Sequence, residues 1–420
     1  MNTMEIARAV AAAIVAVTMA VLVAIVVAVH GAGADDAREL AARAEDACQK
    51  GDLNLAVRLY TDAIQRDPRS ARTYFMRGVA YGKKGDRARE ISDYTEAIRL
   101  NPHFPEAYYN RGIAHRARAQ VHKALADYTE AIRLKPDLVA AYHARGVAYG
   151  VVGYLESAVA DYSEAIRLDP KCSDAYFNRA VAYSSRGDFE RAIADFTEVI
   201  RLEPKSPSAY RGRGGAYIDK REYDRAIADY TEAIRLDPKN ASGYEGRAVA
   251  YREDGHHDRA IADWSEAVRV DPNHARAYYS RGCMYSDRGQ FDEAITDYTE
   301  AIRARPQYAR AFCNRGSAYA AKGDYGNAFG DFAEAIRLDP KDAYAHYNRG
   351  AAYAERGSYD RAIADYTEAI RLDAHYALAY RGRGTAYRNI GEEDKAIADY
   401  TEAIRLKPDD AGRVARPERQ

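Results

Sequence analysis

Arginine and carboxylate side chains recur through this sequence at a fixed spacing of 34 residues. One arginine place is filled eleven times, from Arg43 to Arg383. Sixteen residues after ten of these arginines stands an aspartate, from Asp93 to Asp399, and three residues further a glutamate. Such groups could bind anions, but copying of a structural unit also puts them at matched places. An arginine on the packing side of a helix needs a carboxylate, so we expect both acids to serve an internal Arg–carboxylate ladder.

The other groups capable of chemistry are isolated from one another. His256 and His257 are adjacent, so on a helix their side chains point about 100° apart and make poor joint metal ligands. The run Gly-Arg-Gly-Gly at 212–215 lacks the strand and the glycine spacing of a dinucleotide-binding loop. No nucleophile with a neighbouring base is evident. We therefore expect a protein that is not an enzyme and uses no cofactor or metal.

Charge and cysteine content argue against two further classes. Lys and Arg number 62 against 63 Asp and Glu, for a net charge of −1, so no basic field favours nucleic acid. The four cysteines are scattered, without any CxxC pair, which predicts neither a disulfide framework nor a zinc site. We expect them to be small hydrophobes in or near the core: Cys48, Cys172, Cys283 and Cys313.

The N-terminal segment is strongly apolar. Among residues 9–29 only Thr18 is polar, and a helix of that length reaches about 32 Å, close to the roughly 30 Å of a hydrocarbon core. We expect residues 1–30 to form a single-pass membrane anchor, with 31–36 as a linker. A cleaved signal is the alternative, because small residues at 32–34 precede Asp35. The short tail before the segment favours repeats on the non-cytoplasmic side.

Proline marks a strict period in the rest of the chain. It recurs every 34 residues from Pro68 to Pro340 and again at Pro408, with Ala374 at the one skipped place. Taking proline as slot 32 of a 34-residue unit, eleven repeats fill residues 37–410 without an insertion. Residues 411–420 form a polar tail.

The apolar residues of each unit follow the helical period. They fall at slots 4, 8 and 11 and again at slots 20, 24 and 27, spacings of three and four that indicate two helices. Glycine near slot 15 separates the helices, and proline at slot 32 follows the second. The repeat is therefore predicted to be a helical hairpin of about three turns per arm. In the fifth repeat these slots hold Tyr176, Ala180, Tyr183, Ala192, Phe196 and Val199.

These residues resemble the tetratricopeptide repeat family over residues 37–410. The resemblance implies an all-α fold, an α-solenoid in which a right-handed superhelix presents its first helices along a concave groove that binds protein segments. Arginine at slot 7 departs from the family's usual apolar residue. Glu90 replaces alanine at slot 20, so we expect looser packing in repeat two. Leu40 and Ala47 fill aromatic slots in repeat one, which suits a terminal cap.

The predicted groove consists of slots 2, 5, 6, 9, 12 and 13, on the face that stacking leaves open. Rings at slot 5 should lie in a row facing solvent, and asparagine amides at slot 6 should bond a peptide backbone. The principal row is in repeats two to five, and Arg211 and Glu245 interrupt slot 5 after it. The candidate binding residues are Phe75, Tyr109, His143, Phe177, Tyr279 and Tyr347 at slot 5, and Asn110, Asn178, Asn314 and Asn348 at slot 6.

Two functions remain open on this basis. The first is a membrane-tethered scaffold that binds an extended peptide or protein segment in the groove. A chaperone-tail clamp is not expected, because after Asn110 its two basic slots hold Ala140 and Ala144. The second is an assembly spacer that forms homo-oligomers through its last repeat, where we expect Ile397 and Tyr400 to stay partly exposed.

Overall fold

The computed structural model describes residues 18–21 and 35–407, and every regular element among them is a helix. The chain divides into two compact units, residues 1–204 and 205–420. The expected anchor at residues 9–29 lies outside the described part except for the helical residues 18–21. Within the described ranges no helix is both long enough and apolar enough to cross a membrane.

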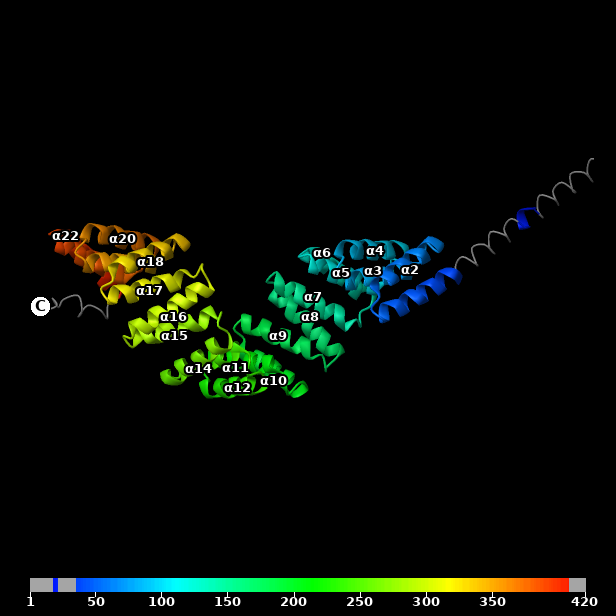
Figure 1. The fold of residues 1–420 in the computed structure, drawn as a ribbon, viewed down its shortest axis with the longest axis horizontal. Helices are drawn as coiled ribbons and strands as arrows, with labels where there is room; N and C mark the ends of the chain where they lie inside the picture. Colours follow the sequence, from blue (N-terminus) through cyan, green and yellow to red (C-terminus); the bar gives the residue numbers. More distant parts are fainter. Residues whose placement is uncertain (1–17, 22–34, 408–420) are drawn as a thin grey trace, which may run out of the picture. The chain divides into compact units, whose positions relative to one another are not determined.

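Unit 1 is a series of helical hairpins, which follow one another in Figure 1. It begins with helical residues 35–49, the first helix of repeat one. The helices that follow are α2 Leu53–Arg66, α3 Ala71–Lys83, α4 Arg87–Leu100, α5 Pro105–Ala117, α6 Val121–Leu134, α7 Val139–Val151, α8 Leu155–Leu168, α9 Ser173–Ser185 and α10 Phe189–Leu202.

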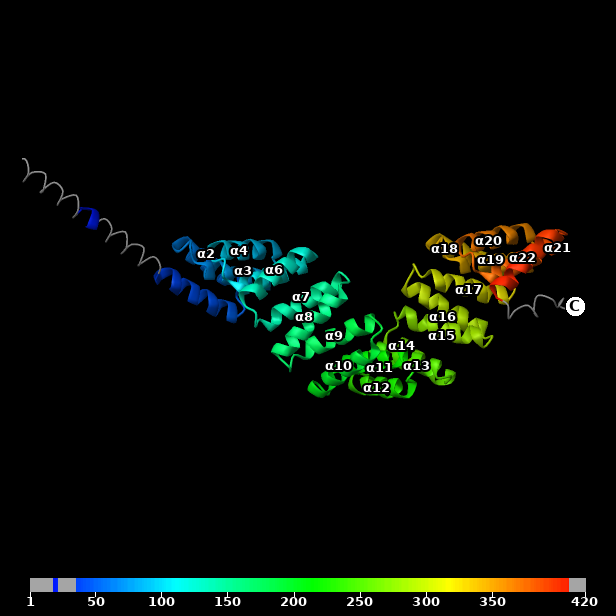
Figure 2. The same ribbon diagram turned by 180° about the vertical axis from the view of Figure 1, so that it is seen from behind.

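Unit 2 continues the same hairpin pattern, seen from the opposite side in Figure 2. From α3 onward, first helices have 13 residues and second helices 14, as the hairpin prediction requires. The helices of unit 2 are α11 Pro207–Asp219, α12 Tyr223–Leu236, α13 Ala241–Glu253, α14 His257–Val270, α15 Ala275–Asp287, α16 Phe291–Ala304, α17 Ala309–Ala321, α18 Tyr325–Leu338, α19 Ala343–Glu355, α20 Tyr359–Leu372, α21 Ala377–Asn389 and α22 Glu393–Leu406.

Within each unit the first helices form an inner layer. A first helix packs on the second helix of its own repeat and on the second helix before it. Neighbouring first helices, such as α5 with α7 and α15 with α17, also contact each other more extensively than neighbouring second helices do. The first-helix side of each unit is thus the more closely drawn together, as expected for the concave face.

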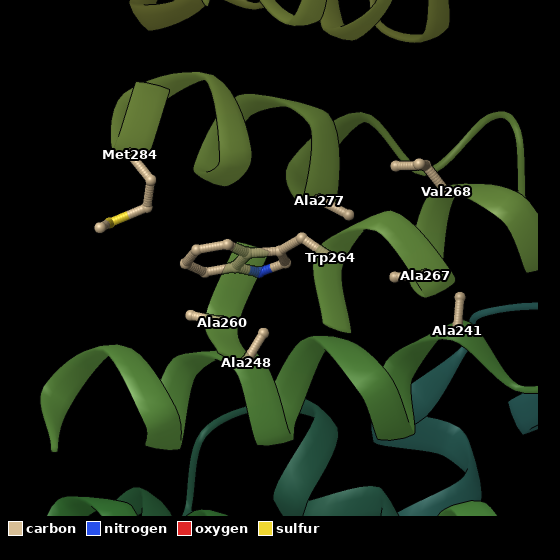
Figure 3. Close-up of a cluster of buried hydrophobic side chains, with 8 residues drawn as sticks. All are labelled: Ala241, Ala248, Ala260, Trp264, Ala267, Val268, Ala277 and Met284. Carbon is tan, nitrogen blue, oxygen red and sulfur yellow. The ribbon is translucent and has the colours of Figure 1, made fainter. Parts of the chain in front are cut away.

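Each hairpin closes on an aromatic ring that lies against a small residue. In repeat three Tyr128, at slot 24, is fully buried, and a Cβ added to Gly112 at slot 8 would lie 2.6 Å from its Cε1 atom. Repeat seven has Trp264 in that slot, surrounded by Ala248, Ala260 and Met284 from three successive helices (Figure 3). Slot 8 is small because the ring occupies the space that a larger side chain would need.

The expectation of looser packing at Glu90 was wrong. Its side chain is buried, and Oε2 accepts a hydrogen bond of 2.7 Å from Arg87. A Cβ at Gly82 would stand 2.5 Å from Glu90 Oε1, so the glycine opposite provides the room. A longer side chain at slot 20 is accommodated by the absence of one on the facing helix.

The turn between the two helices requires a left-handed residue at slot 15. Nine repeats place glycine there with φ between +71° and +82°. Repeats three and six instead hold Ala119 at φ 57° and Arg221 at φ 62°. A side chain in this region crowds the following carbonyl and costs roughly 1–2 kcal/mol, which glycine avoids.

Replacing either residue by glycine should therefore stabilise the protein. We expect Ala119→Gly and Arg221→Gly each to raise the free energy of unfolding by about 1 kcal/mol, measured by urea titration.

The matched control is Ala126→Gly, which makes the same change at an exposed site inside α6. It should destabilise by about 1 kcal/mol. A loss of stability on Ala119→Gly comparable to that of the control would contradict the strain at slot 15.

Candidate functional site

The arginine at slot 7 is held by the aspartate of its own repeat. In repeat four Arg145 donates two hydrogen bonds of 2.8 Å to the carboxylate of Asp161 and a third, of 3.1 Å, to Thr129 in the preceding repeat. Its guanidinium also lies over the rings of Tyr142 and Tyr149. The bidentate pair recurs in ten repeats, from Arg77–Asp93 to Arg383–Asp399, which confirms the internal ladder.

The glutamate at slot 26 does not belong to this ladder, contrary to expectation. It pairs with the arginine three residues further on its own helix, as Glu164 does with Arg167 at 2.6 Å. Repeat one has Leu59 at slot 23, and there Arg43 is exposed to solvent. The slot 7 arginine is therefore half-buried only where an aspartate receives it, and its pairing there leaves it unsuited to binding an external anion.

The ladder carboxylates differ in their electrostatic surroundings. Burial raises the pKa of Asp297 above its usual value despite the hydrogen bonds from Arg281. Burial acts in the same direction on Asp365, but the hydrogen bonds from Arg349 and the imidazole of His346, whose Nδ1 lies 3.7 Å from Oδ1, together bring its pKa below the usual value. The nearby imidazole of His346 is the feature that distinguishes the surroundings of Asp365 from those of Asp297.

The predicted slot 5 rings lie on the first-helix face, but they do not stand free in solvent. All six are half-buried, and each packs on the ring at slot 24 of its own repeat. The centroid of Phe177 lies 5.5 Å from that of Phe196, and Tyr109 lies 6.0 Å from Tyr128. The expectation that these rings face solvent was therefore only partly right, because one side of each ring packs on the hairpin core.

A further aromatic slot supports some of these rings. Slot 34 holds Phe104, Tyr308 and Tyr376 in repeats two, eight and ten. Each packs on the slot 5 ring of its own repeat. The ring centroids lie 4.8 Å apart for Phe104 and Phe75 and 5.1 Å apart for Tyr376 and Tyr347. Sequence reasoning missed slot 34, although its residue precedes the first helix of the next repeat.

The slot 6 asparagines join consecutive repeats. Asn178 Nδ2 lies 2.8 Å from Nε2 of His143, and burial lowers the pKa of His143, so a neutral imidazole accepts this bond. Asn314 donates to the Tyr279 hydroxyl at 3.1 Å, and Asn348 to the thiol sulfur of Cys313 at 3.4 Å. Slots 5 and 6 of neighbouring repeats therefore touch, and the amides are partly engaged within the protein. For Asn110 the structure gives only a half-buried position.

A hollow of about 340 Å³ opens on the first-helix face of unit 2. Apart from Tyr230 of α12, its lining residues come from α11, α13 and α15 and occupy the slots expected to form the groove. They include Asp219, Glu245 and Arg276. The sequence analysis did not predict this hollow, although two glycines, Gly215 at slot 9 and Gly246 at slot 6, indicate it.

Metal-ligating side chains and thiols are the remaining candidates for chemistry among the described residues. Among them no group of three or more histidine, cysteine or acidic side chains could hold a metal ion. Cys48, Cys172 and Cys283 are half-buried and Cys313 is buried, which confirms their expected place in or near the core.

Comparison with known families identifies the repeat. The matching family models describe this repeat, and their matches lie between residues 71 and 410. The chain belongs to the tetratricopeptide repeat family. Models described as tetratricopeptide repeat match residues 71–104, 105–138, 182–241, 229–262, 264–296, 343–376 and 377–410, and a model described as TPR repeat matches 152–187, 282–323 and 316–357.

Solved structures match the chain with TM-scores below 0.5. Yeast Tom70 shares 16% identity over 88% of this chain and 92% of its own, with a TM-score of 0.44. A tetratricopeptide repeat protein from Parabacteroides merdae ATCC 43184 shares 22% over 62% and 99%, with a TM-score of 0.49. YrrB, a TPR protein with an unusual peptide-binding site, shares 26% over 44% and 95%, with a TM-score of 0.36. No curated protein matches the chain.

The ladder makes a direct prediction about stability. Arg145→Met leaves the carboxylate of Asp161 buried without its bidentate donor, so we expect it to destabilise the protein by about 3 kcal/mol in urea unfolding. The double variant with Asp161→Leu should lose less, because no buried charge remains.

Glu164→Gln serves as the control in the same repeat. It removes a carboxylate whose ion pair with Arg167 is exposed, and we expect the unfolding midpoint to stay unchanged. An equal loss of stability for Arg145→Met and Glu164→Gln would show that the ladder ion pair stabilises the protein no more than an exposed ion pair does.

Proposed function

We propose that this protein is a scaffold that binds an extended segment of another protein along the first helices of unit 1. The observation that carries the proposal is the contact between His143 and Asn178 of consecutive repeats. It brings slot 5 of one repeat against slot 6 of the next, which supports a row of Phe75, Tyr109, His143 and Phe177 along the first helices. Each ring is half-buried and fixed by the ring beneath it, and such preorganised anchors lose little entropy on binding.

The chemistry of this row favours shape and apolar contact over charge. Charged groups along the same face carry both signs, including Arg72, Lys83, Arg116 and Asp174, all exposed. An extended peptide would place side chains on the rings and its amides near the remaining hydrogen-bonding capacity of Asn110 and Asn178. The salt dependence of binding should therefore be modest.

Tethering to a membrane is part of the proposal and rests on the sequence alone. Residues 9–29 have the length and the apolar character of a single span. The repeats would then stand on the non-cytoplasmic side, since a short tail precedes the span. The partner would meet the scaffold at a membrane surface.

Site-specific crosslinking tests where the partner binds. A benzophenone amino acid replacing His143 in the full chain, expressed in membranes, should crosslink a partner segment in high yield. The same amino acid replacing Ala160, exposed on α8 of the same repeat, should not. Equal yields from the two positions would sink the proposed surface.

Substitutions in the row must respect its packing role. Tyr109→Leu with Phe177→Leu keeps an apolar side chain over the rings beneath, so we expect only a small fall in melting temperature. Affinity for the crosslinked segment should fall about tenfold or more, because aromatic anchors dominate such interfaces. Unchanged affinity would assign the rings to the core alone.

Self-association through the last repeat is the second candidate function. Ile397, at slot 21 of α22, is 61% exposed, whereas that slot is half-buried in the ten preceding repeats. Tyr400 is half-buried, and its hydroxyl donates to Thr385 at 3.2 Å. The partial exposure expected for these two residues is therefore confirmed, and Ile397 is the more exposed of the two.

Sedimentation of the full chain tests this candidate. If the chain forms dimers, Ile397→Asp should shift the equilibrium to monomer, because a charge would be buried in the contact. Ala398→Asp, at the exposed neighbouring residue, is the control and should leave the dimer intact. A dimer that survives Ile397→Asp would have to form elsewhere.

A further inference from the structure

The hollow in unit 2 exists because two glycines face a tyrosine ring. A Cβ on Gly246 would lie 2.1 Å from Cε1 of Tyr230, so the ring occupies the place where other repeats begin a slot 6 side chain. A Cβ on Gly215 would lie 3.6 Å from the Tyr230 hydroxyl oxygen. Repeats five, nine and ten carry asparagine at slot 6, and its amide covers the preceding repeat. No slot 6 side chain covers the hollow.

A carboxylate lies in its wall. The side chain of Glu245 is only 13% exposed. One oxygen, Oε2, lies 3.4 Å from Nε2 of His274, which is the usual contact between slots 5 and 34. The other, Oε1, is buried and lies 2.8 Å from Nε of Arg276, yet it accepts no hydrogen bond there. Because a buried carboxylate oxygen normally accepts one or more, Glu245 retains binding capacity.

The surrounding charges favour a cation. Asp219, on α11, is exposed at the edge of the hollow, so two carboxylates line it against the single guanidinium of Arg276. The Arg276 side chain is 73% exposed, so its guanidinium can leave Glu245 at little cost. Burial first, then the charges of Glu245 and Asp219, raise the pKa of Tyr230 to about 12, while Arg211 acts in the opposite direction. The phenol is therefore protonated, and its oxygen can accept a hydrogen bond.

We infer that this hollow binds the cationic side chain, arginine or lysine, of a peptide that lies along the first helices of unit 2. The inference rests on the proposed peptide-binding function and adds one sequence requirement for the ligand. The cation would donate to Glu245 Oε1, face Asp219 across the opening, and displace Arg276 into solvent. An anionic group would stand between two carboxylates, and a neutral one would gain less from them.

Small probes test the hollow independently of any natural partner. The probes are the Nα-acetyl N-methylamides of arginine, lysine, citrulline and glutamate, and binding to the full chain is followed by saturation-transfer NMR. We expect signals from arginine and lysine and none from glutamate. Citrulline, which matches arginine in shape without its charge, should bind about tenfold more weakly, since a hydrogen bond to a charged group contributes at least that factor.

Two variants locate the binding. Asp219→Asn changes an exposed side chain and should weaken the arginine probe severalfold without affecting the fold. Glu245→Gln should weaken it about tenfold or more. Glu232→Gln, on α12, removes an acid that pairs with Arg235 and should have no effect. The chain has a single tryptophan, Trp264, buried next to α13, so an unchanged emission spectrum shows that this core is intact in each variant.

The outcomes separate this inference from the proposed function. Equal binding of arginine and citrulline, or binding unaltered by both Asp219→Asn and Glu245→Gln, overturns the cation site. The crosslinking result at His143 in unit 1 would stand in that case. Loss of crosslinking at His143 with an intact NMR signal from the arginine probe would instead contradict binding along the row of rings and leave the cation site supported.

Discussion

The bidentate ion pair between slot 7 and slot 23 is the polar contact that joins the two helices in ten of the eleven hairpins. It joins the two helices of a repeat through two hydrogen bonds, and in most repeats a third reaches a hydroxyl in the preceding repeat. One guanidinium thus ties three helices together, between two tyrosine rings of its own helix. Burying the two charges costs hydration free energy, which only good geometry offsets, and that accounts for the near identity of the ten pairs.

The ion pair occupies only part of the surface of the first helix, and slots 5 and 8 contact the aromatic ring at slot 24. Slot 8 must be small because the slot 24 ring lies against it, and the slot 5 ring then rests on that same slot 24 ring. Core and candidate groove are therefore two sides of one aromatic layer. A groove of this kind is rigid, since each exposed ring edge belongs to a side chain whose other face is packed.

Sequence reasoning recovered what repetition makes visible. Ten copies of a proline, eleven of an arginine and the recurring apolar triads determine the hairpin, its boundaries and the ladder partner Asp161 of Arg145. It failed where a contact depends on which helix a side chain leans toward. Glu164 lies three residues from both Asp161 and Arg167, and only the fold shows that it turns to the arginine of its own helix. Half-burial of Tyr109 was equally invisible, because a helical wheel gives a direction but not the size of the neighbouring ring.

The hollow in unit 2 forms where residues depart from the repeat pattern, and such departures indicate a local function. A residue that recurs from copy to copy makes the same internal contact each time, as the slot 7 arginine does with the slot 23 aspartate in ten repeats, and its type is explained by packing. Slot 5 is different: it holds Phe, Tyr or His in repeats two to five, then Arg211 and Glu245. Slot 6 is glycine in both of these repeats, Gly212 and Gly246, and the Tyr230 ring occupies the space left at Gly246. Two coupled departures on one helix replace an aromatic surface by an acidic cavity, which distinguishes this part of unit 2 from the row in unit 1.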